Sequence, residues 1–406
     1  MRKSGRGTPG GPGSGLKPLN IWHMSFRLAW SDLVHDRARL LASISGVGFA
    51  VFLILIEVGF LNGIYDTQTE LVYRLDGDLF LINRLKDDIL PTRPFERARL
   101  HQASGVTGVR SVHPLYMNEF TGVWKSPGGG HSHVILVLAL DPADDVLKIP
   151  EVQAAKAALQ LPDTALFDLR SRDLYGRPAV GDVAELANRR VRLVGTFEMG
   201  PSFRNDGVAV MSDSNFLRYF PDPVTGRPDP DAVEIGIVRL EPEADLHTVR
   251  QSMDKLLPND VAVLTADDFA GRIRTFWSVY QPIGIIFGLG AAIGFAIGVT
   301  ICYQVLFNDI SDNLPQLATL KAMGYTDGFL SRVVICKALM LSLLGFLPGT
   351  LLGLALYNSL EAWTGIRMWL TGPRAAMVLV LSIGMCVLAG RFAARKTRTA
   401  DPADLF

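Results

Sequence analysis

The sequence has no net charge and little charge of either sign. Its 406 residues include 40 Lys and Arg against 40 Asp and Glu, and charged residues make up only 20% of the chain. Soluble domains carry about 25% charged residues on average. A chain without a positive excess has no long-range attraction for nucleic-acid phosphates. We therefore expect no nucleic-acid partner.

Cysteine is also scarce. The three cysteines, Cys302, Cys336 and Cys386, each lie inside a long apolar run. They have neither the even number nor the spacing of a disulfide framework. We expect them to be small apolar packing residues. Any soluble part of the protein must then be stabilised by its own hydrophobic core.

Motifs of catalysis and metal binding are missing. The chain contains no G-x-x-x-x-G-K-[ST] phosphate loop, no H-E-x-x-H and no nucleophile elbow. His131 and His133, near Asp141, Asp144 and Asp145, have no third ligand at the spacing that zinc sites use. The sequence predicts a protein that is not an enzyme, uses no metal or other cofactor, and does not hydrolyse ATP by itself.

Apolar residues are what the sequence has in excess. They make up 49% of the chain, and the mean hydropathy is +0.24. Four runs are long enough to cross a hydrocarbon layer of about 30 Å. They are residues 40–61, 276–307 (with the end of a stalk), 333–357 and 375–392. The predicted fold is an integral membrane protein with four transmembrane helices and a large extracytoplasmic α+β domain, residues 62–275, between the first and the second.

The flanks of these runs predict the orientation. Arg27, Arg37 and Arg39 precede the first run, and Arg391, Arg395, Lys396 and Arg398 follow the fourth. Lys and Arg accumulate on the cytoplasmic side of membrane proteins, so we expect both termini in the cytoplasm. The other segments are a disordered tail (1–18), a cytoplasmic amphipathic helix (19–39), a cytoplasmic loop (308–332), a short outer loop (358–374) and a cytoplasmic tail (393–406).

The outer segment alternates strand-like and helix-like stretches. The expected strands are rich in Val, Ile, Leu and Phe and cover residues 78–83, 134–140, 191–197, 207–211, 233–240 and 261–264. The expected helices are residues 95–103, 152–159, 212–219 and 244–257. A last helix, residues 267–280, is expected to continue without a break into the second run.

Glycines recur every four residues along the second run, at Gly284 and Gly288 and at Gly290, Gly294 and Gly298. Small residues at this spacing let two membrane helices approach closely. The pattern predicts a dimer interface, and the alternative is packing of the same face inside one chain.

Two charged residues lie within apolar runs. Glu57 is about a turn from the outer end of the first run, and we expect an interfacial carboxylate there. Lys337 is near the cytoplasmic end of the third run, and we expect its side chain to extend toward the membrane surface.

The loop between the second and third runs contains a short amphipathic helix. Leu314, Leu317, Leu320 and Met323 recur at helical spacing, Pro315 suits a first turn, and Gly324 is a typical end. A surface helix with an apolar face fits a groove on another protein. Packing of the same face on the membrane surface is the alternative.

The segment 318–324, Ala-Thr-Leu-Lys-Ala-Met-Gly, resembles the coupling-helix motif of the MacB/FtsX class of ABC transporter permeases, R-E-x-x-x-L-(R/K)-A-x-G, and within it the heterocyst-type DevC exporters. Lys321 and Gly324 match the motif, whereas Gln316 stands where many relatives carry Glu. The order of segments after residue 20 and the Asp401-Pro402-Ala403 tail fit the same class.

This resemblance implies a homodimeric permease in the cell inner membrane. It implies a separate ABC ATPase that docks at Leu314, Gln316, Leu317, Leu320, Lys321, Met323 and Gly324, and a periplasmic adaptor leading to an outer-membrane channel. The ATPase motion would be passed to the outer domain, which expels substrate. The alternatives are an FtsX-like regulator of a cell-wall hydrolase, a lipoprotein-release machine and, less in keeping with the short tail, a receptor.

Overall fold

The computed structural model describes residues 18–90, 92–127 and 132–397. The expected disordered tail, His131 and the Asp401-Pro402-Ala403 tail lie largely or wholly outside them. The described chain divides into two compact units. Residues 18–60, 286–358 and 369–397 form the helical unit, and residues 61–285 and 359–368 form the α+β unit. Each is described by itself.

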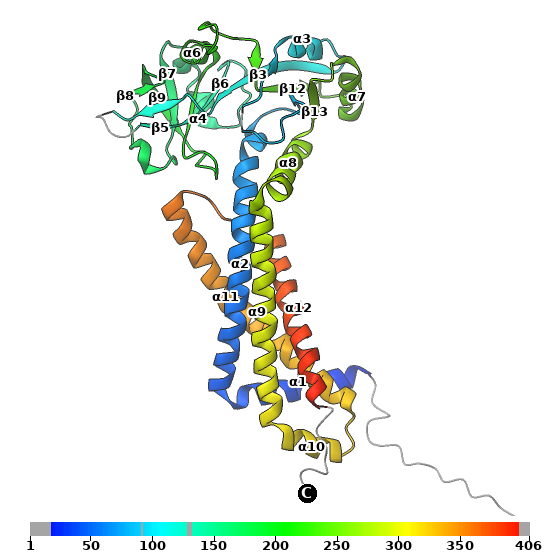
Figure 1. Cartoon of the computed structure of the whole chain (residues 1–406). Helices are drawn as coiled ribbons and strands as arrows, with labels where there is room; N and C mark the ends of the chain where they lie inside the picture. Colours follow the sequence, from blue (N-terminus) through cyan, green and yellow to red (C-terminus); the bar gives the residue numbers. More distant parts are fainter. Residues whose placement is uncertain (1–17, 91, 128–131, 398–406) are drawn as a thin grey trace, which may run out of the picture. The chain divides into compact units, whose positions relative to one another are not determined.

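Long apolar helices build the helical unit (Figure 1). They are α2 (Arg37–Arg74), α9 (Pro282–Asp312), α11 (Asp327–Thr364) and α12 (Gly372–Thr397). By length and composition, these four helices can each cross a membrane. The described residues thus confirm the predicted four spans with an α+β domain between the first and the second. Two further helices, α1 (Pro18–His35) and α10 (Leu314–Ala322), lie at one end of this unit.

Small residues set the packing of the helical unit. A Cβ atom at Gly349 of α11 would lie 2.5 Å from the carbonyl oxygen of Gly48 in α2, so the two backbones touch. Cys302 of α9 and Cys386 of α12 are buried, with their sulfur atoms 3.1 Å apart. All three cysteines are free thiols buried among apolar neighbours, as expected of packing residues.

The α+β unit contains an eleven-stranded sheet with the order β13-β1-β12-β3-β6-β10-β7-β9-β8-β4-β5. Its strands are β1 (Leu79–Asn83), β3 (Val109–Asn118), β4 (Val123–Lys125), β5 (Ser132–Val134), β6 (Leu136–Leu140), β7 (Thr164–Asp168), β8 (Val183–Leu186), β9 (Arg189–Phe197), β10 (Val208–Ser212), β12 (Ile235–Leu240) and β13 (Val261–Leu264). The pairs β6–β10 and β7–β9 are parallel, and the others are antiparallel. A two-stranded sheet pairs β2 (Phe95–Glu96) with β11 (Ala232–Val233).

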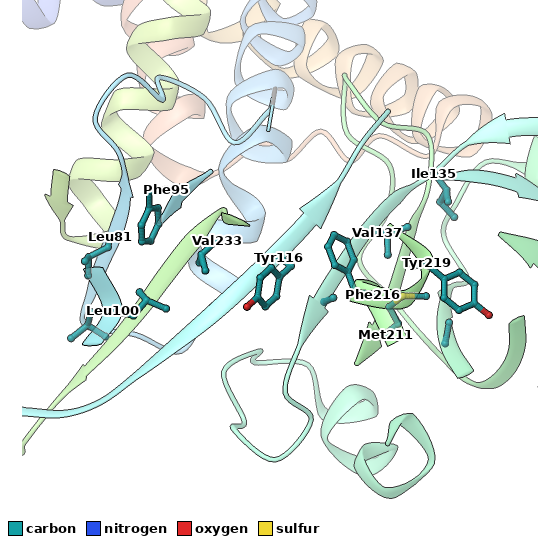
Figure 2. Packing of buried hydrophobic residues seen from close by; sticks show 14 of the residues in the cluster. Leu81, Phe95, Leu100, Tyr116, Ile135, Val137, Met211, Phe216, Tyr219 and Val233 are labelled. Carbon is teal, nitrogen blue, oxygen red and sulfur yellow. The ribbon is translucent and has the colours of Figure 1, made fainter. Parts of the chain in front are cut away.

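Strand β3 joins the two halves of the large sheet. It pairs with β12 along most of its length and with β6 through Tyr116, Met117 and Asn118. Tyr116 lies between Val233 and Phe216 in the core (Figure 2), and its ring centroid is 5.8 Å from that of Phe216. The core therefore runs through both halves of the sheet.

Short helices cover the sheet, and local capping explains several of them. They are α3 (Ala98–Ser104), α4 (Pro150–Ala154), α5 (Lys156–Leu159), a 3-10 turn (Asp173–Tyr175), α6 (Asp213–Tyr219), α7 (Leu246–Leu256) and α8 (Ala266–Thr275). Ser212, Asp245 and Thr265 cap α6, α7 and α8, each side chain accepting a hydrogen bond from a backbone N–H three residues later.

The expected unbroken helix over residues 267–280 and the second span is wrong. Helix α8 ends at Thr275 and is followed by a π-helical turn, Phe276–Tyr280. Gln281 is extended (φ −94°, ψ 138°), and α9 begins at Pro282. Proline restricts the preceding residue to extended conformations, which explains why the helix stops there.

Candidate coupling site at the ends of α9 and α11

Helix α10 occupies the loop between the second and third spans. It has nine residues, with Pro315 in its first turn. Gly324 follows it with φ +96°, a conformation that favours glycine, and donates a hydrogen bond from its N–H to the Lys321 carbonyl. Thr326 then accepts backbone hydrogen bonds from the first turn of α11. The chain therefore presents a short helix between two closely spaced turns.

The exposed face of α10 differs from the expected apolar one. Ala318 is buried, and Leu320 packs against a cluster that includes Phe329 and Leu330 of α11. Leu314 is half-buried, and nothing is described of the Leu317 side chain. The exposed residues are Pro315, Gln316, Thr319, Ala322 and Met323, and we call this set the coupling face. Of the four predicted apolar anchors, Met323 alone is described as exposed (55%).

Lys321 also differs from the expectation of an outward contact. Its ammonium lies 3.0 Å from the Asp327 carboxylate at the start of α11, and its side chain is 19% exposed. This ion pair closes the turn between α10 and α11. Lys321 therefore positions the coupling face.

A buried ion-pair cluster lies beside α10. Lys337 is 6% exposed, and its ammonium contacts the carboxylates of Asp32 and, at 2.5 Å, Asp309. The predicted extension of Lys337 toward the membrane surface is therefore wrong. Arg39 continues the cluster, 2.7 Å from Asp312 and 3.7 Å from Asp309. The cluster joins α1, α2, the end of α9 and the start of α11, so it holds the two helices that flank α10.

Sequence reasoning missed Asp32 and Asp309. The available signal was Lys337 itself, because an ammonium inside an apolar run needs a counter-charge. Asp32 and Asp309 are among the acidic residues near the C-terminal ends of α1 and α9. A cavity of about 190 Å³ borders the cluster and is also lined by His35 and Asp36.

The glycines of the second span pack mostly inside the chain. Gly290 lies against the Glu57 carboxylate, Gly294 against Leu53 and Ile54, and Gly298 against Ala50 and Met385. Gly284 packs on the backbone of Ser278. Of these five glycines, only Gly288 has room for a Cβ atom with no other atom within 4 Å. Intramolecular packing, the alternative to a dimer interface, therefore describes four of them.

Glu57 is half-buried on α2, and its carboxylate occupies the space above Gly290. The Glu57 carboxylate, which we expected at the membrane interface, therefore lies against the surface of α9. Glycine at 290 provides the room, since a Cβ atom there would overlap the carboxylate.

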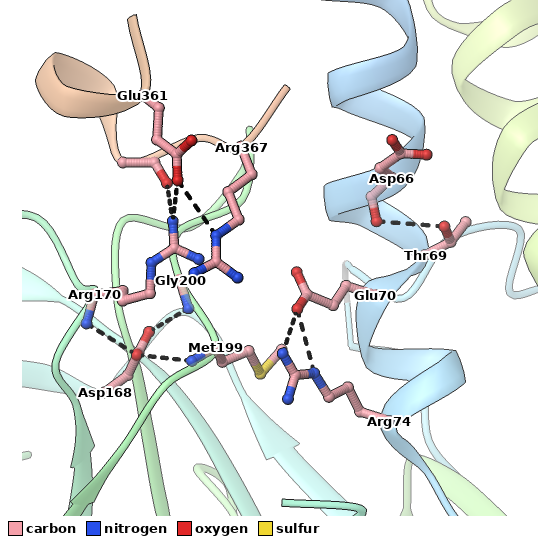
Figure 3. Close-up of polar contacts among 11 residues, drawn as sticks. Asp66, Thr69, Glu70, Arg74, Asp168, Arg170, Met199, Gly200, Glu361 and Arg367 are labelled. Atoms are coloured by element: carbon pink, nitrogen blue, oxygen red, sulfur yellow. Dashed lines mark hydrogen bonds and ion pairs between the residues drawn. The ribbon is translucent and has the colours of Figure 1, made fainter. Parts of the chain in front are cut away.

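In the α+β unit, polar contacts join the last turn of α11 and Gly365 to the residues that follow β7, and Asp168 at the end of β7 to the residues that follow β9 (Figure 3). Arg170 donates to Glu361 (3.2 Å) and to the carbonyl of Gly365 (3.1 Å). The buried Asp168 accepts backbone N–H bonds from Met199, Gly200 and Arg170. Burial raises the pKa of the Asp168 carboxyl, and these three hydrogen bonds oppose that rise. Asp168 and Arg170 thus fix the loop around Gly200 to residues 361–365.

No group of three His, Cys, Asp or Glu side chains is placed to hold a metal ion within residues 18–90, 92–127 and 132–397. His133 lies on β5 with its ring 5.9 Å from that of Tyr175.

Comparison with known proteins identifies the C-terminal part of the chain. Residues 288–402 match the model of the FtsX-like permease C-terminal domain. The chain carries an FtsX-like permease domain. This domain contains α10, α11 and α12 and most of α9. The resemblance to the MacB/FtsX class is confirmed at this level, and the closer likeness to DevC exporters stays a prediction.

A relative that matches more of the chain is distant. An uncharacterized ABC transporter permease of Methanocaldococcus jannaschii is 23% identical over 236 residues, which cover 55% of this chain and 57% of that protein. The chain thus spans little more than half the length of that relative.

Solved structures similar to the chain include the periplasmic region of MacB from Actinobacillus actinomycetemcomitans, with 12% identity and a TM-score of 0.35 over 50% of this chain and 95% of that one. The extracellular domain of the noncanonical ABC-type transporter YknZ from Gram-positive bacteria has 12% identity and a TM-score of 0.34, covering 46% and 99%. A domain of a permease protein from Porphyromonas gingivalis has 15% identity and a TM-score of 0.31, covering 46% and 88%.

Proposed function

We propose that this FtsX-like permease is the membrane subunit of an ABC exporter. A separate ATPase subunit docks on the coupling face of α10, and its motion passes through α9 and α11 to the extracytoplasmic domain. The observation that carries the proposal is the exposed coupling face on a short helix fixed at both ends, by the Lys321–Asp327 pair and by the Lys337 cluster. A rigidly held surface helix transmits displacement, whereas a flexible loop absorbs it.

The proposed assembly follows the MacB/FtsX resemblance. The permease lies in the cell inner membrane with both termini in the cytoplasm, in keeping with its Arg-rich flanks. A periplasmic adaptor and an outer-membrane channel complete the export path. The few polar residues within the spans support this arrangement, because a hydrophilic route through the helices would need more.

Co-purification from native membranes tests this assignment. We expect the tagged full chain to bring down one ABC ATPase subunit, whose hydrolysis rate differs between the complex and the free subunit, together with an adaptor and a channel. Recovery of a cell-wall hydrolase without an adaptor would support the FtsX-like regulator instead. A complex without an ATPase would contradict both.

We also propose a homodimer, with an interface on α9 that differs from the predicted glycine face. Gly288, Ala292, Ala296 and Thr300 recur every four residues, and all four are exposed. Small residues at this spacing permit close packing between membrane helices. Of the originally predicted residues, this interface keeps Gly288.

Cysteine crosslinking tests the interface. The native cysteines are buried, so Ala292→Cys or Ala296→Cys should give a disulfide-linked dimer in oxidised native membranes. Leu351→Cys on α11, which is also exposed, serves as the control and should remain monomeric. Equal crosslinking of the Ala292→Cys and Leu351→Cys variants would argue against a dimer through this face.

A further inference from the structure

We propose that the loop Gly200–Asn205 of the α+β unit rests on the outer leaflet of the bilayer, with the Phe203 side chain in the headgroup layer. The partner surface is phospholipid. Contacts within the α+β unit fix the depth of this loop along α2.

The first contact is between Gly63 and Met368. Gly63 lies on α2 two residues beyond Leu61, the expected end of the first span, and thus about 3 Å beyond it at 1.5 Å per residue. A Cβ atom at Gly63 would lie 3.2 Å from Met368 Cγ. Residues 365–368 are therefore close to the border of the hydrocarbon layer. A Cβ atom at Gly365 would in turn lie 2.8 Å from Pro201 Cγ, so the loop begins at this level.

The second contact is between the side chains of Tyr65 and Ser278, which lie close together. Tyr65 lies four residues beyond Leu61, or about 6 Å. The headgroup layer on each side of a bilayer is about 5–8 Å thick, so Ser278 and its neighbour Trp277 lie within it. The Phe203 ring meets the Trp277 ring edge-on, with centroids 5.8 Å apart and an interplanar angle of 85°. The loop therefore lies between the depths of the two contacts, those made by Gly63 and by Tyr65 on α2.

Phe203 is exposed although hydrogen bonds hold the loop that carries it. The loop is tied to Asp168 through the N–H groups of Met199 and Gly200 (Figure 3), and Ser202 donates its N–H to the Asn205 carbonyl. Phe203 is nevertheless 49% exposed. A large apolar ring held outward at headgroup depth gains free energy by contact with lipid.

Other aromatic residues of the α+β unit mark the same level. Trp363, at the end of α11, is 90% exposed, and Tyr280, two residues before α9, is also exposed. Trp and Tyr are enriched where membrane proteins meet the headgroup region. Phe203 is more than 70 positions away from both Tyr280 and Trp363 in the sequence. It adds a residue of the loop after β9 to this group of aromatic side chains.

Spin-label depth measurements test the proposal. Nitroxide-labelled Phe203→Cys full chain would be placed in nanodiscs of phosphatidylcholine and phosphatidylglycerol. The buried native cysteines leave position 203 as the labelling site. Val224→Cys, at a 91% exposed residue in the Asp222–Arg227 turn, is the aqueous reference, and Trp363→Cys is the membrane-border reference. We expect the ratio of oxygen to nickel-chelate accessibility at 203 to match that at 363 and to exceed that at 224 several-fold.

Two outcomes would overturn the proposal. Accessibility at 203 equal to that at 224 would place Phe203 in water, and an aqueous value at 363 would invalidate the depth markers. A label at the exposed neighbour, Arg204→Cys, in chains with Phe203 or Phe203→Leu controls for misfolding of the Phe203→Cys variant, because residue 203 itself is then unlabelled. The result does not depend on ATP hydrolysis or export, so it can fail while the exporter assignment stands.

Discussion

Replacing Met323 by aspartate should uncouple ATP hydrolysis from export while leaving the permease folded in the membrane. Met323 lies on the coupling face and is exposed, so the free chain tolerates a carboxylate there. In the complex the same carboxylate would be buried without a partner, which costs several kcal/mol at a protein interface. About 3 kcal/mol weakens binding roughly a hundredfold.

The measurement compares the ATPase rate of the permease complex and export in reconstituted vesicles for wild type and variant. Val224→Asp places the same charge on an exposed loop of the α+β unit and should change neither quantity. Leu320→Asp serves as the opposite control, because Leu320 packs against α11 and its substitution should reduce stability itself. Wild-type coupling by a well-folded Met323→Asp variant would remove the coupling face from the mechanism.

Replacing Lys337 by methionine should destabilise the helical unit by about 3–5 kcal/mol, the usual cost of removing one partner of a buried ion pair. The reason is that Asp32 and Asp309 would both lose the ammonium that they contact, and Asp309 would keep the more distant Arg39, 3.7 Å away. Thermal unfolding of the purified permease in nanodiscs measures the loss. Adding Asp32→Asn and Asp309→Asn to the same chain should restore much of it, because the uncompensated charges disappear.

A matched ion pair on the surface distinguishes the effect of burial from the effect of charge on stability. Arg177 and Asp173 also form an ion pair, but both side chains are at least 80% exposed. Arg177→Met should therefore cost no more than about 1 kcal/mol. Similar losses for Lys337→Met and Arg177→Met would show that the Lys337 cluster contributes no more than a surface pair.

The order of the spans and six strands of the large sheet could be predicted because their signal is local, whereas β4, β7 and β8 were not expected. β1, β6, β9, β10, β12 and β13 are short apolar stretches between Gly, Pro and Asp, and each was expected within a few residues. The central strand β3 was missed because Pro114 interrupts its pattern, and proline is rare inside sheets. In the structure Pro114 pairs in register with Gly236, which has no side chain to crowd it.

The helix of the candidate coupling site could be predicted from the sequence, but its exposed face could not. Periodicity indicated an apolar face on residues 314–323, yet Phe329 and Leu330 of the same chain cover part of it. Lys337 and Asp32 are separated by 305 positions, so no local pattern could reveal that pair. Which glycines of the second span face α2 and which face outward also depends on helix rotation, which sequence spacing leaves open.

The crossing of α2 and α11 at Gly48 and Gly349 has a mechanical consequence. The distance between these helices is set by main-chain atoms, which have no rotamers to exchange, so thermal motion of side chains cannot widen or narrow it. Even one added methyl group at residue 349 would push α2 and α11 apart. This crossing therefore fixes the separation of α2 and α11 at that level.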